Sequence, residues 1–213
     1  MLNVCEIYLS IQGETSFSGL PCIFIRLSGC NLNCAWCDSE YSRYTQQEMS
    51  VDEIVEAIND YKPVDLVEIT GGEPLIQQDT PILIETLSQI GYKVLLETNG
   101  SISIGDLPSQ VINIVDVKCP SSGEKNSFLR DNLIYLDPEK DELKFVIGDR
   151  KDYDFAREFI MYNNLWGYHI LFSTVFGELE PRKLIEWILK DRLSVRFQLQ
   201  AQKYIWELDQ RGV

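Results

Sequence analysis

Short apolar runs of strand length alternate along the chain with longer amphipathic stretches, and this alternation constrains the fold more than any other feature. The sequence predicts helices at about 50–61, 80–90, 152–162 and 181–189, between strands at 21–27, 66–70, 93–97, 111–118, 143–147, 169–173 and 195–199. Alternating strands and helices form βαβ units and a largely parallel sheet. A complete eight-fold βα barrel typically needs about 250 residues. With 213 residues, the chain is predicted to be an α/β protein with an incomplete TIM-type βα barrel, in one domain over 1–213.

Local signals place the ends of two of these helices. Ser50 and Glu53 fit a capping box, and Thr80 is expected to cap the next helix, with Gly91 just past its end. The polar stretch 120–133 has poor periodicity and is expected to be a loop or a broken helix. Ligands of such folds gather where the carboxyl ends of the strands open, so functional residues are expected just after strands.

Three cysteines lie within eight residues, just after the first predicted strand. Cys30, Cys34 and Cys37 have the spacing C-x3-C-x2-C, and no fourth cysteine follows nearby. Thiolates are the preferred protein ligands of iron–sulfur clusters, so the three cysteines predict a [4Fe-4S] cluster whose fourth iron has no protein sulfur. An open metal position marks a site that binds and activates a ligand. The pattern indicates S-adenosylmethionine at that iron, and radical chemistry.

Two plainer interpretations of the cysteines are less consistent with the sequence. Structural zinc needs four ligands, and the remaining candidates are not at zinc-knuckle spacing: Cys5, Cys22, Cys119 and the single His169. Free cysteines are often buried in cores, which is the expectation for Cys22 in its apolar strand. His169 is likewise expected to be a packed strand residue, and one histidine leaves little room for a histidine-based catalytic site.

The segment Thr70-Gly71-Gly72-Glu73-Pro74 follows the strand predicted at 66–70. Adjacent glycines let the backbone bend sharply and approach a ligand closely, and Glu73 offers an acceptor for an ammonium group. Alone, Gly-Gly-Glu-Pro would indicate a turn. After a strand and a three-cysteine loop, it predicts a site for the methionyl amine of S-adenosylmethionine.

Composition excludes some classes of function. The formal net charge is -14, from 19 Lys+Arg and 33 Asp+Glu, whereas a protein that binds a phosphate backbone needs a basic face. No segment approaches the ~20 apolar residues of a membrane span, and no secretory signal is visible at residues 1–6. We therefore expect no direct nucleic-acid partner, no membrane partner and a cytoplasmic location, where thiols stay reduced.

The three-cysteine loop with Trp36 before its last cysteine, followed by Gly-Gly-Glu-Pro, resembles the radical S-adenosylmethionine (radical SAM) superfamily. A narrower resemblance, to the 7-carboxy-7-deazaguanine synthase family, rests on motifs in the same order: 11–14, Arg26, 37–39, 97–100, 116–120 and 211–213. It implies conversion of 6-carboxy-5,6,7,8-tetrahydropterin to 7-carboxy-7-deazaguanine with loss of ammonia, upstream of queuosine. It also implies Mg²⁺ dependence, an external electron donor and a homodimer.

The resemblance implies roles for particular residues. The substrate contacts would be Ile11, Gln12, Gly13, Glu14, Arg26, Thr70 and Val213. The S-adenosylmethionine contacts would be Trp36, Asp38, Gly72, Glu73, Glu97, Asp116, Val117 and Lys118. The metal ligands would be Cys30, Cys34 and Cys37 for the cluster and Ser39 for Mg²⁺.

Several of these residues have an ordinary structural interpretation as well. Arg26 would serve as a surface ion pair, Thr70 as a strand former and Ser39 as a cap after the cysteine loop. The chain also departs from the family: Gln202 occupies a slot that commonly holds histidine, and glutamine cannot change charge near neutral pH. Asp116 stands where the family often has serine.

Two other functions remain open from the residues alone. A radical SAM activase, which makes a radical in a partner protein, shares the cysteine spacing and needs neither the 11–14 motif nor Arg26. A non-catalytic iron–sulfur electron carrier is less consistent with the chain, because carriers normally complete all four cluster ligands.

Overall fold

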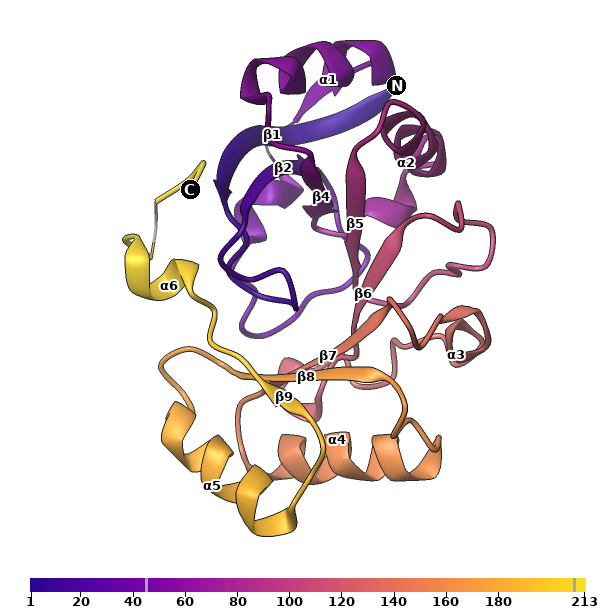
Figure 1. Ribbon diagram of the computed structural model, residues 1–213. Helices are drawn as coiled ribbons and strands as arrows, with labels where there is room; N and C mark the ends of the chain where they lie inside the picture. Colours follow the sequence, from indigo (N-terminus) through magenta and orange to yellow (C-terminus); the bar gives the residue numbers. More distant parts are fainter. Residues whose placement is uncertain (45, 209) are drawn as a thin grey trace.

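The computed structural model describes residues 1–44, 46–208 and 210–213, and its centre is one nine-stranded sheet (Figure 1). The strand order is β3-β1-β2-β4-β5-β6-β7-β8-β9. The β1–β2 and β1–β3 pairings are antiparallel, and every other pairing is parallel. The strands are β1 (Leu2–Ile11), β2 (Pro21–Leu27), β3 (Gln47–Met49), β4 (Leu66–Gly71), β5 (Lys93–Thr98), β6 (Ile112–Asp116), β7 (Glu142–Ile147), β8 (His169–Thr174) and β9 (Arg196–Phe197).

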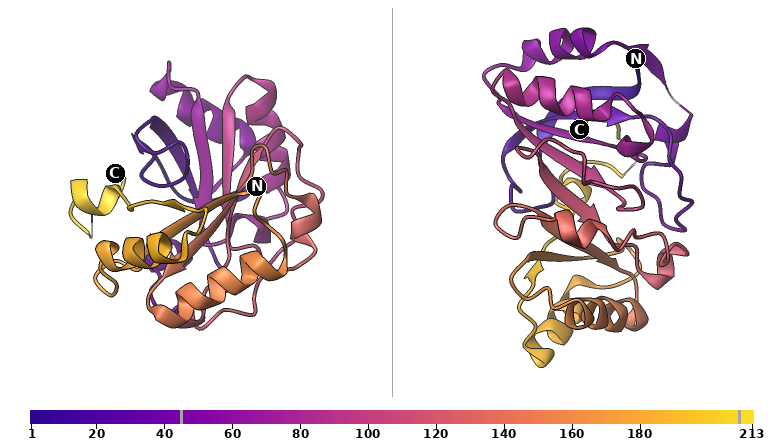
Figure 2. Two further views of the ribbon diagram at one scale, coloured as in Figure 1. Left: turned by 60° about the horizontal axis from the view of Figure 1, so that its bottom comes forward. Right: turned by 90° about the vertical axis from the view of Figure 1, so that its right-hand side faces the viewer.

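The α-helices are α1 (Val51–Ile58), α2 (Thr80–Gln89), α3 (Asn132–Tyr135), α4 (Arg150–Tyr162), α5 (Pro181–Asp191) and α6 (Gln202–Ile205). Helices α1, α2, α4 and α5 cover the outer side of the curved sheet, and α6 lies beside its open side (Figures 1 and 2). The 3-10 turns are η1 (Glu40–Arg43), η2 (Asn59–Tyr61), η3 (Pro74–Ile76) and η4 (Pro120–Ser122). The edge strands β3 and β9 do not pair with each other, so the sheet stays open, which confirms the predicted partial barrel.

Three apolar clusters hold the sheet in place. One packs α1 and α2 against the outer face of the N-terminal strands, and a second packs α4 and α5 against the outer face of the C-terminal strands. A third, smaller cluster lies inside the curve of the sheet: Tyr8, Cys22, Phe24, Leu66, Leu95 and Ile114. The interior cluster fills the space at the amino ends of the parallel strands, and the burial of Cys22 confirms its predicted core position.

Polar residues form the next layer on the same interior face. Side chains two residues apart along a strand point to the same side, so Leu66 is followed on β4 by Glu68 and then Thr70. The same step leads from Leu95 to Glu97 on β5 and from Ile114 to Asp116 on β6. Polar groups therefore gather above the apolar layer, where the carboxyl ends of the strands open.

Four details differ from the sequence-based expectations. Asp79, not Thr80, is the N-cap of α2, because the Thr80 hydroxyl donates to the Pro74 carbonyl at 2.6 Å. His169 is exposed rather than packed, because it begins β8 at the rim of the sheet. The last strand, β9, is only two residues long. β1 and β3 were absent from the predicted order, because a bulge between Val4 and Glu6 interrupts the alternation of β1 and because β3 is an edge strand of only three residues.

None of the helices in the described part of the chain has the length and apolar character that crossing a bilayer requires.

The capping box of α1 gives a stability prediction. The Ser50 side chain accepts from the Glu53 amide at 3.2 Å, and Glu53 accepts from the Ser50 amide at 2.7 Å. S50A should lower the free energy of unfolding by about 1 kcal/mol, measured by chemical denaturation. The matched control is T86A on α2, which removes a hydroxyl bonded to the Ile82 carbonyl inside a helix. T86A should not destabilise the fold; equal effects of the two variants would contradict the capping role.

Candidate functional site

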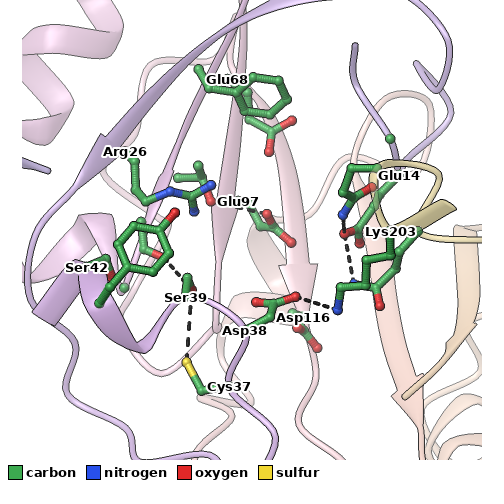
Figure 3. Close-up of a pocket in the computed structure, with 18 of the residues that line it drawn as sticks. Glu14, Arg26, Cys37, Asp38, Ser39, Ser42, Glu68, Glu97, Asp116 and Lys203 are labelled. Carbon is green, nitrogen blue, oxygen red and sulfur yellow. Dashed lines mark hydrogen bonds and ion pairs between the residues drawn. The ribbon is translucent and has the colours of Figure 1, made fainter. Parts of the chain in front are cut away.

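A cavity of about 420 Å³ opens at the carboxyl ends of the strands (Figure 3). It brings together nearly all of the residues that the sequence singled out. Those that line it are Ile11, Gln12, Gly13, Glu14, Arg26, Cys30, Cys34, Trp36, Cys37, Asp38, Ser39, Thr70, Gly72, Glu97, Asp116, Lys118 and Val213. Gln202, in the slot where the family commonly has histidine, also lines it. Two expected residues, Glu73 and Val117, do not.

The cysteine loop runs between β2 and η1 and lies directly on the turn that follows β4. Gly29 has φ of +88°, and its carbonyl accepts from the Glu73 amide at 2.9 Å. A Cβ atom on Gly72 would lie 2.1 Å from the Gly29 carbonyl oxygen and 2.7 Å from the Cys30 Cβ. The approach is too close for any side chain, so Gly72 is required where the two loops touch.

The donor set of this loop fits an iron–sulfur cluster. The Leu32 amide donates to Cys30 Sγ at 3.5 Å, and the Asn99 side-chain amide lies 4.0 Å from the same sulfur. Within the described ranges, no three His, Cys, Asp or Glu side chains are placed to share a single metal ion. The ligands of a [4Fe-4S] cluster do not need to converge on one metal ion, because each thiolate binds its own iron. Three thiols around one cavity, with N–H donors near a sulfur, therefore fit such a cluster.

Glu73 is fully buried behind the cavity wall. Its carboxylate accepts from the Leu75 amide at 3.0 Å, the Thr98 hydroxyl at 2.8 Å and the Asn99 amide at 2.7 Å. Burial raises the pKa of this carboxyl group, and the three donors partly oppose that shift. In this structure Glu73 ties the Gly-Gly-Glu-Pro turn to the end of β5, and Val117 is likewise fully buried.

A buried network of charges joins the turn after β1 to β4, β5 and β7. Gln12 Nε2 donates to Glu68 Oε2 at 2.7 Å, and Gln12 Oε1 accepts from the Glu14 amide at 2.7 Å. Lys144 Nζ forms ion pairs with Glu14 and, at 2.6 Å, with Glu97. Burial alone would lower the pKa of Lys144, but the neighbouring carboxylates hold it well above its ordinary value. Lys144 therefore remains a cation inside the cavity wall.

Arg26 faces the cavity from β2 and is not a surface charge. Its Nε donates to Glu6 Oε1 at 2.8 Å and its Nη2 donates to the Tyr8 hydroxyl at 2.9 Å. The Tyr41 hydroxyl donates to the same Glu6 oxygen at 2.7 Å. These partners from β1 and η1 fix the guanidinium plane, and Figure 3 shows the Arg26 side chain directed into the cavity. A fixed guanidinium is suited to binding a carboxylate.

A second set of charged groups lines the side of the cavity nearer β6. Lys118 Nζ pairs with Asp116 at 2.7 Å and lies 5.5 Å from the centre of the Trp36 ring. Farther along the same rim, Lys203 pairs with Asp38 at 2.8 Å.

Ser39 lies at the mouth of the loop that carries the cysteines. Its hydroxyl donates to the Gly71 carbonyl at 3.5 Å and lies 4.0 Å from Cys37 Sγ. Although Ser39 is the N-cap residue of η1, its side chain makes no capping hydrogen bond. The hydroxyl is therefore a hard oxygen donor at the cavity wall.

The C-terminal segment packs across the turn after β1. Gln200 and Gln202 both donate to Glu14 Oε1, at 3.0 and 2.7 Å, and the Ala201 amide donates to the Gly13 carbonyl at 2.9 Å. A Cβ atom on Gly13 would lie 1.9 Å from Gln202 Oε1, so glycine lets the segment approach. Residues 206–208 and 210–213 also line the cavity.

The sequence analysis missed Glu6, the partner of Arg26, and two buried charged residues of the cavity wall, Glu68 and Lys144. Each of these two is nearly fully buried within a strand, at 2% and 4% exposure. The sequence does mark the two buried residues. Glu68 is the charged residue in the predicted strand Leu66–Thr70, and Lys144 is the charged residue in the predicted strand Leu143–Ile147. Charged residues are almost never fully buried unless they are paired.

Comparisons with known proteins show which family this chain resembles. The sequence profile of the radical SAM superfamily matches residues 24–110, which contain the three cysteines and the Gly-Gly-Glu-Pro turn. Over its whole length the chain is 46% identical to the 7-carboxy-7-deazaguanine synthase of Koribacter versatilis (strain Ellin345), and it covers 100% of that protein. It is 44% identical to the 7-carboxy-7-deazaguanine synthase of Chlorobaculum tepidum, again over 100% of this chain and over 97% of the relative.

A solved structure shares the fold. The crystal structure of QueE from Escherichia coli superposes with a TM-score of 0.75 at 22% sequence identity, and the match covers 94% of each chain.

The contact between Gly72 and the cysteine loop generates a prediction. G72A should displace the loop and reduce the iron bound after anaerobic reconstitution by more than half, while circular dichroism still reports a folded protein. The matched control is G167A, because Gly167 has no heavy atom within 4 Å of its ideal Cβ position and no positive φ. Wild-type iron content in G72A would show that the approach of the two loops does not organise the cysteines.

Proposed function

The chain belongs to the 7-carboxy-7-deazaguanine synthase family, within the radical SAM superfamily, and we propose that it converts 6-carboxy-5,6,7,8-tetrahydropterin to 7-carboxy-7-deazaguanine with loss of ammonia. The chain is thus a radical SAM enzyme and a lyase. One observation carries the proposal: a single cavity is lined by three cysteines, by a fixed arginine and by the turn at residues 11–14. Neither an activase for a partner protein nor an electron carrier needs that combination.

Membership of the superfamily implies a [4Fe-4S] cluster and S-adenosylmethionine. We assign the cluster to Cys30, Cys34 and Cys37. When bound, the two groups would supply a radical that abstracts a hydrogen atom from the substrate. The cofactor would lie against the side of the cavity formed by Trp36, Asp38, Gly72, Glu97 and the 116–118 strand end. There the Asp116–Lys118 pair offers both charges, which suits the amine and carboxylate of an amino acid.

The substrate would occupy the opposite side of the cavity. Arg26 presents a held guanidinium for the substrate carboxylate. Tyr8 and Phe24 are stacked with ring centroids 5.1 Å apart and form an apolar wall suited to a planar heterocycle. The turn at 11–14 and Thr70 bring acceptors and donors to the edge of a pterin. Val213 lines the cavity, and its terminal carboxylate would contact the substrate.

Glu73 and Val117 enter this proposal in a different way from the other residues. Both were expected to contact S-adenosylmethionine, and both lie behind the wall of the cavity. Glu73 would act by tying its own turn, through the Leu75 amide, to the end of β5, through Thr98 and the following Asn99. Val117 would act through its backbone, whose amide donates to the Lys144 carbonyl at 2.8 Å.

Magnesium and the wider assembly are further parts of the proposal. Ser39 would contribute its hydroxyl to Mg²⁺, which prefers oxygen ligands and retains water or substrate in its shell. A carboxylate shared by the metal and Arg26 would orient the substrate. As the family resemblance implies, the enzyme would act as a homodimer and would receive electrons from an external donor. The six free cysteines suit a reducing compartment, the cytoplasm.

The function is tested by an anaerobic assay of the reconstituted enzyme. With a chemical reductant, S-adenosylmethionine, Mg²⁺ and 6-carboxy-5,6,7,8-tetrahydropterin, mass spectrometry should detect 7-carboxy-7-deazaguanine and 5'-deoxyadenosine. Formation of 5'-deoxyadenosine without the deazaguanine would assign radical chemistry on another substrate. Absence of both products from protein with a full complement of iron would favour a carrier.

If Ser39 is a ligand of Mg²⁺, enzyme activity at limiting Mg²⁺ should depend on the Ser39 hydroxyl oxygen. S39A should lower turnover at limiting Mg²⁺ by about tenfold or more, because the metal loses its protein ligand. S39T keeps the hydroxyl and should retain activity, which makes it the matched control. The measurement is the rate of product formation against Mg²⁺ concentration. A Mg²⁺ response in S39A that equals the wild-type response would remove Ser39 from the metal site.

A further inference from the structure

Glu68 is a buried carboxyl group that no role above accounts for. It lies on β4 two residues before Thr70, is 2% exposed and lines the cavity. Its Oε2 accepts from Gln12 Nε2 at 2.7 Å. Within residues 1–44, 46–208 and 210–213, Gln12 is the hydrogen-bond partner of this carboxyl group, and no hydrogen bond reaches Oε1. Figure 3 shows the carboxyl group directed into the space between Arg26 and Glu14.

The charges around Glu68 favour its neutral form. Three interior carboxyl groups, from Glu14, Glu68 and Glu97, share one ammonium group, and Lys144 pairs with Glu14 and Glu97 but not with Glu68. Burial, followed by the charge of Glu97, raises the pKa of Glu68 to about 8. The other titratable groups near it on the adjoining strands are Tyr8, Cys22 and Arg26. The Nε of Arg26 is ion-paired with Glu6. At neutral pH the carboxyl group therefore carries a proton.

The hydrogen bond from Gln12 indicates which oxygen carries that proton. Oε2 accepts an N–H, and the carbonyl oxygen of a carboxylic acid is its better acceptor. The hydroxyl is therefore Oε1, the oxygen that faces the cavity. A carboxylic acid kept neutral by its surroundings is a known way to present a hydrogen-bond donor at neutral pH.

We propose that Glu68 is a further substrate-binding residue, a neutral carboxylic acid whose Oε1 hydroxyl donates a hydrogen bond to an acceptor atom of the pterin heterocycle. The carbonyl oxygen and ring nitrogens of a pterin are such acceptors. Phe24, which pairs with Glu68 in the sheet, and Tyr8 form the stacked wall beside it, so a ring lying on that wall would bring its edge to Oε1. The inference rests on the proposed function and assigns one contact within it.

Two substitutions distinguish the effect of the hydrogen-bond donor at residue 68 from the effect of a carboxylate charge there. In E68Q the amide oxygen still accepts from Gln12 and the amide nitrogen still donates into the cavity. In E68L both groups are lost at similar volume. The binding assay uses enzyme loaded with the cluster and S-adenosylmethionine, without reductant, and follows the fluorescence of the probe 6-carboxypterin. At pH 7, E68Q should bind within about threefold of wild type, and E68L should bind about tenfold or more weakly.

The pH dependence of the affinity for 6-carboxypterin distinguishes a hydrogen-bond donor from a residue with a merely structural role. Wild-type affinity should fall relative to E68Q as pH rises through about 8, because the Oε1 donor becomes an acceptor with negative charge. Titration of the probe affects both proteins equally, so the difference between the two profiles reports Glu68. The matched control is E142Q, a buried carboxyl on β7 that hydrogen-bonds to Ser16 and does not line the cavity. Its profile should follow wild type.

The outcomes separate this inference from the function on which it rests. Wild-type binding of 6-carboxypterin together with unchanged affinity in E68L, or a pH profile of E68Q that matches wild type, overturns the role of Glu68 and leaves the function standing. Failure of the wild-type enzyme to bind 6-carboxypterin overturns the substrate assignment and the inference with it.

Discussion

The contact between Glu14 and Lys144 closes the open side of the barrel. In a complete barrel the first and last strands would pair through backbone hydrogen bonds, but here β3 and β9 remain unpaired edges. The turn after β1 crosses the gap instead. It places Glu14 on Lys144 of β7, and the Gly13 carbonyl accepts from Ala201 beyond β9. Breaking a buried ion pair by removing one partner costs about 3–5 kcal/mol, so this closure is a strong constraint on the fold.

Because closure depends on side chains, the polar groups that hold the barrel together also line the cavity. The interior has an apolar layer at the amino ends of the strands and a charged layer above it. Lys144 pairs with Glu14, which we propose contacts the substrate, and with Glu97, which we propose contacts S-adenosylmethionine. One buried cation thus holds a carboxylate proposed for each of the two ligands.

The sequence predicted the parts that local patterns determine. The parallel open sheet followed from the alternation of strands and helices, and the spacing of the three cysteines placed a loop after β2, as observed. The two glycines were predicted to let the backbone approach a ligand, and the structure shows Gly72 in close approach to the Gly29 carbonyl of the cysteine loop.

Contacts between distant segments could not be predicted in the same way. Arg26 is fixed by Glu6, a partner 20 residues away, and Lys144 pairs with Glu14 across most of the chain. No local period encodes such pairs, although a charge inside an apolar strand marked Glu68 and Lys144 as residues in need of partners. The burial of Glu73 was equally unpredictable, because its donors come from β5 and from its own turn.

A structure determined without oxygen, with cluster, S-adenosylmethionine and 6-carboxypterin bound, tests the central claim most directly. The account predicts three cysteine ligands on the cluster, the cofactor on the Asp116–Lys118 side and the pterin between Arg26 and Glu68. A fourth protein ligand on the cluster, or a pterin bound outside this cavity, would contradict it.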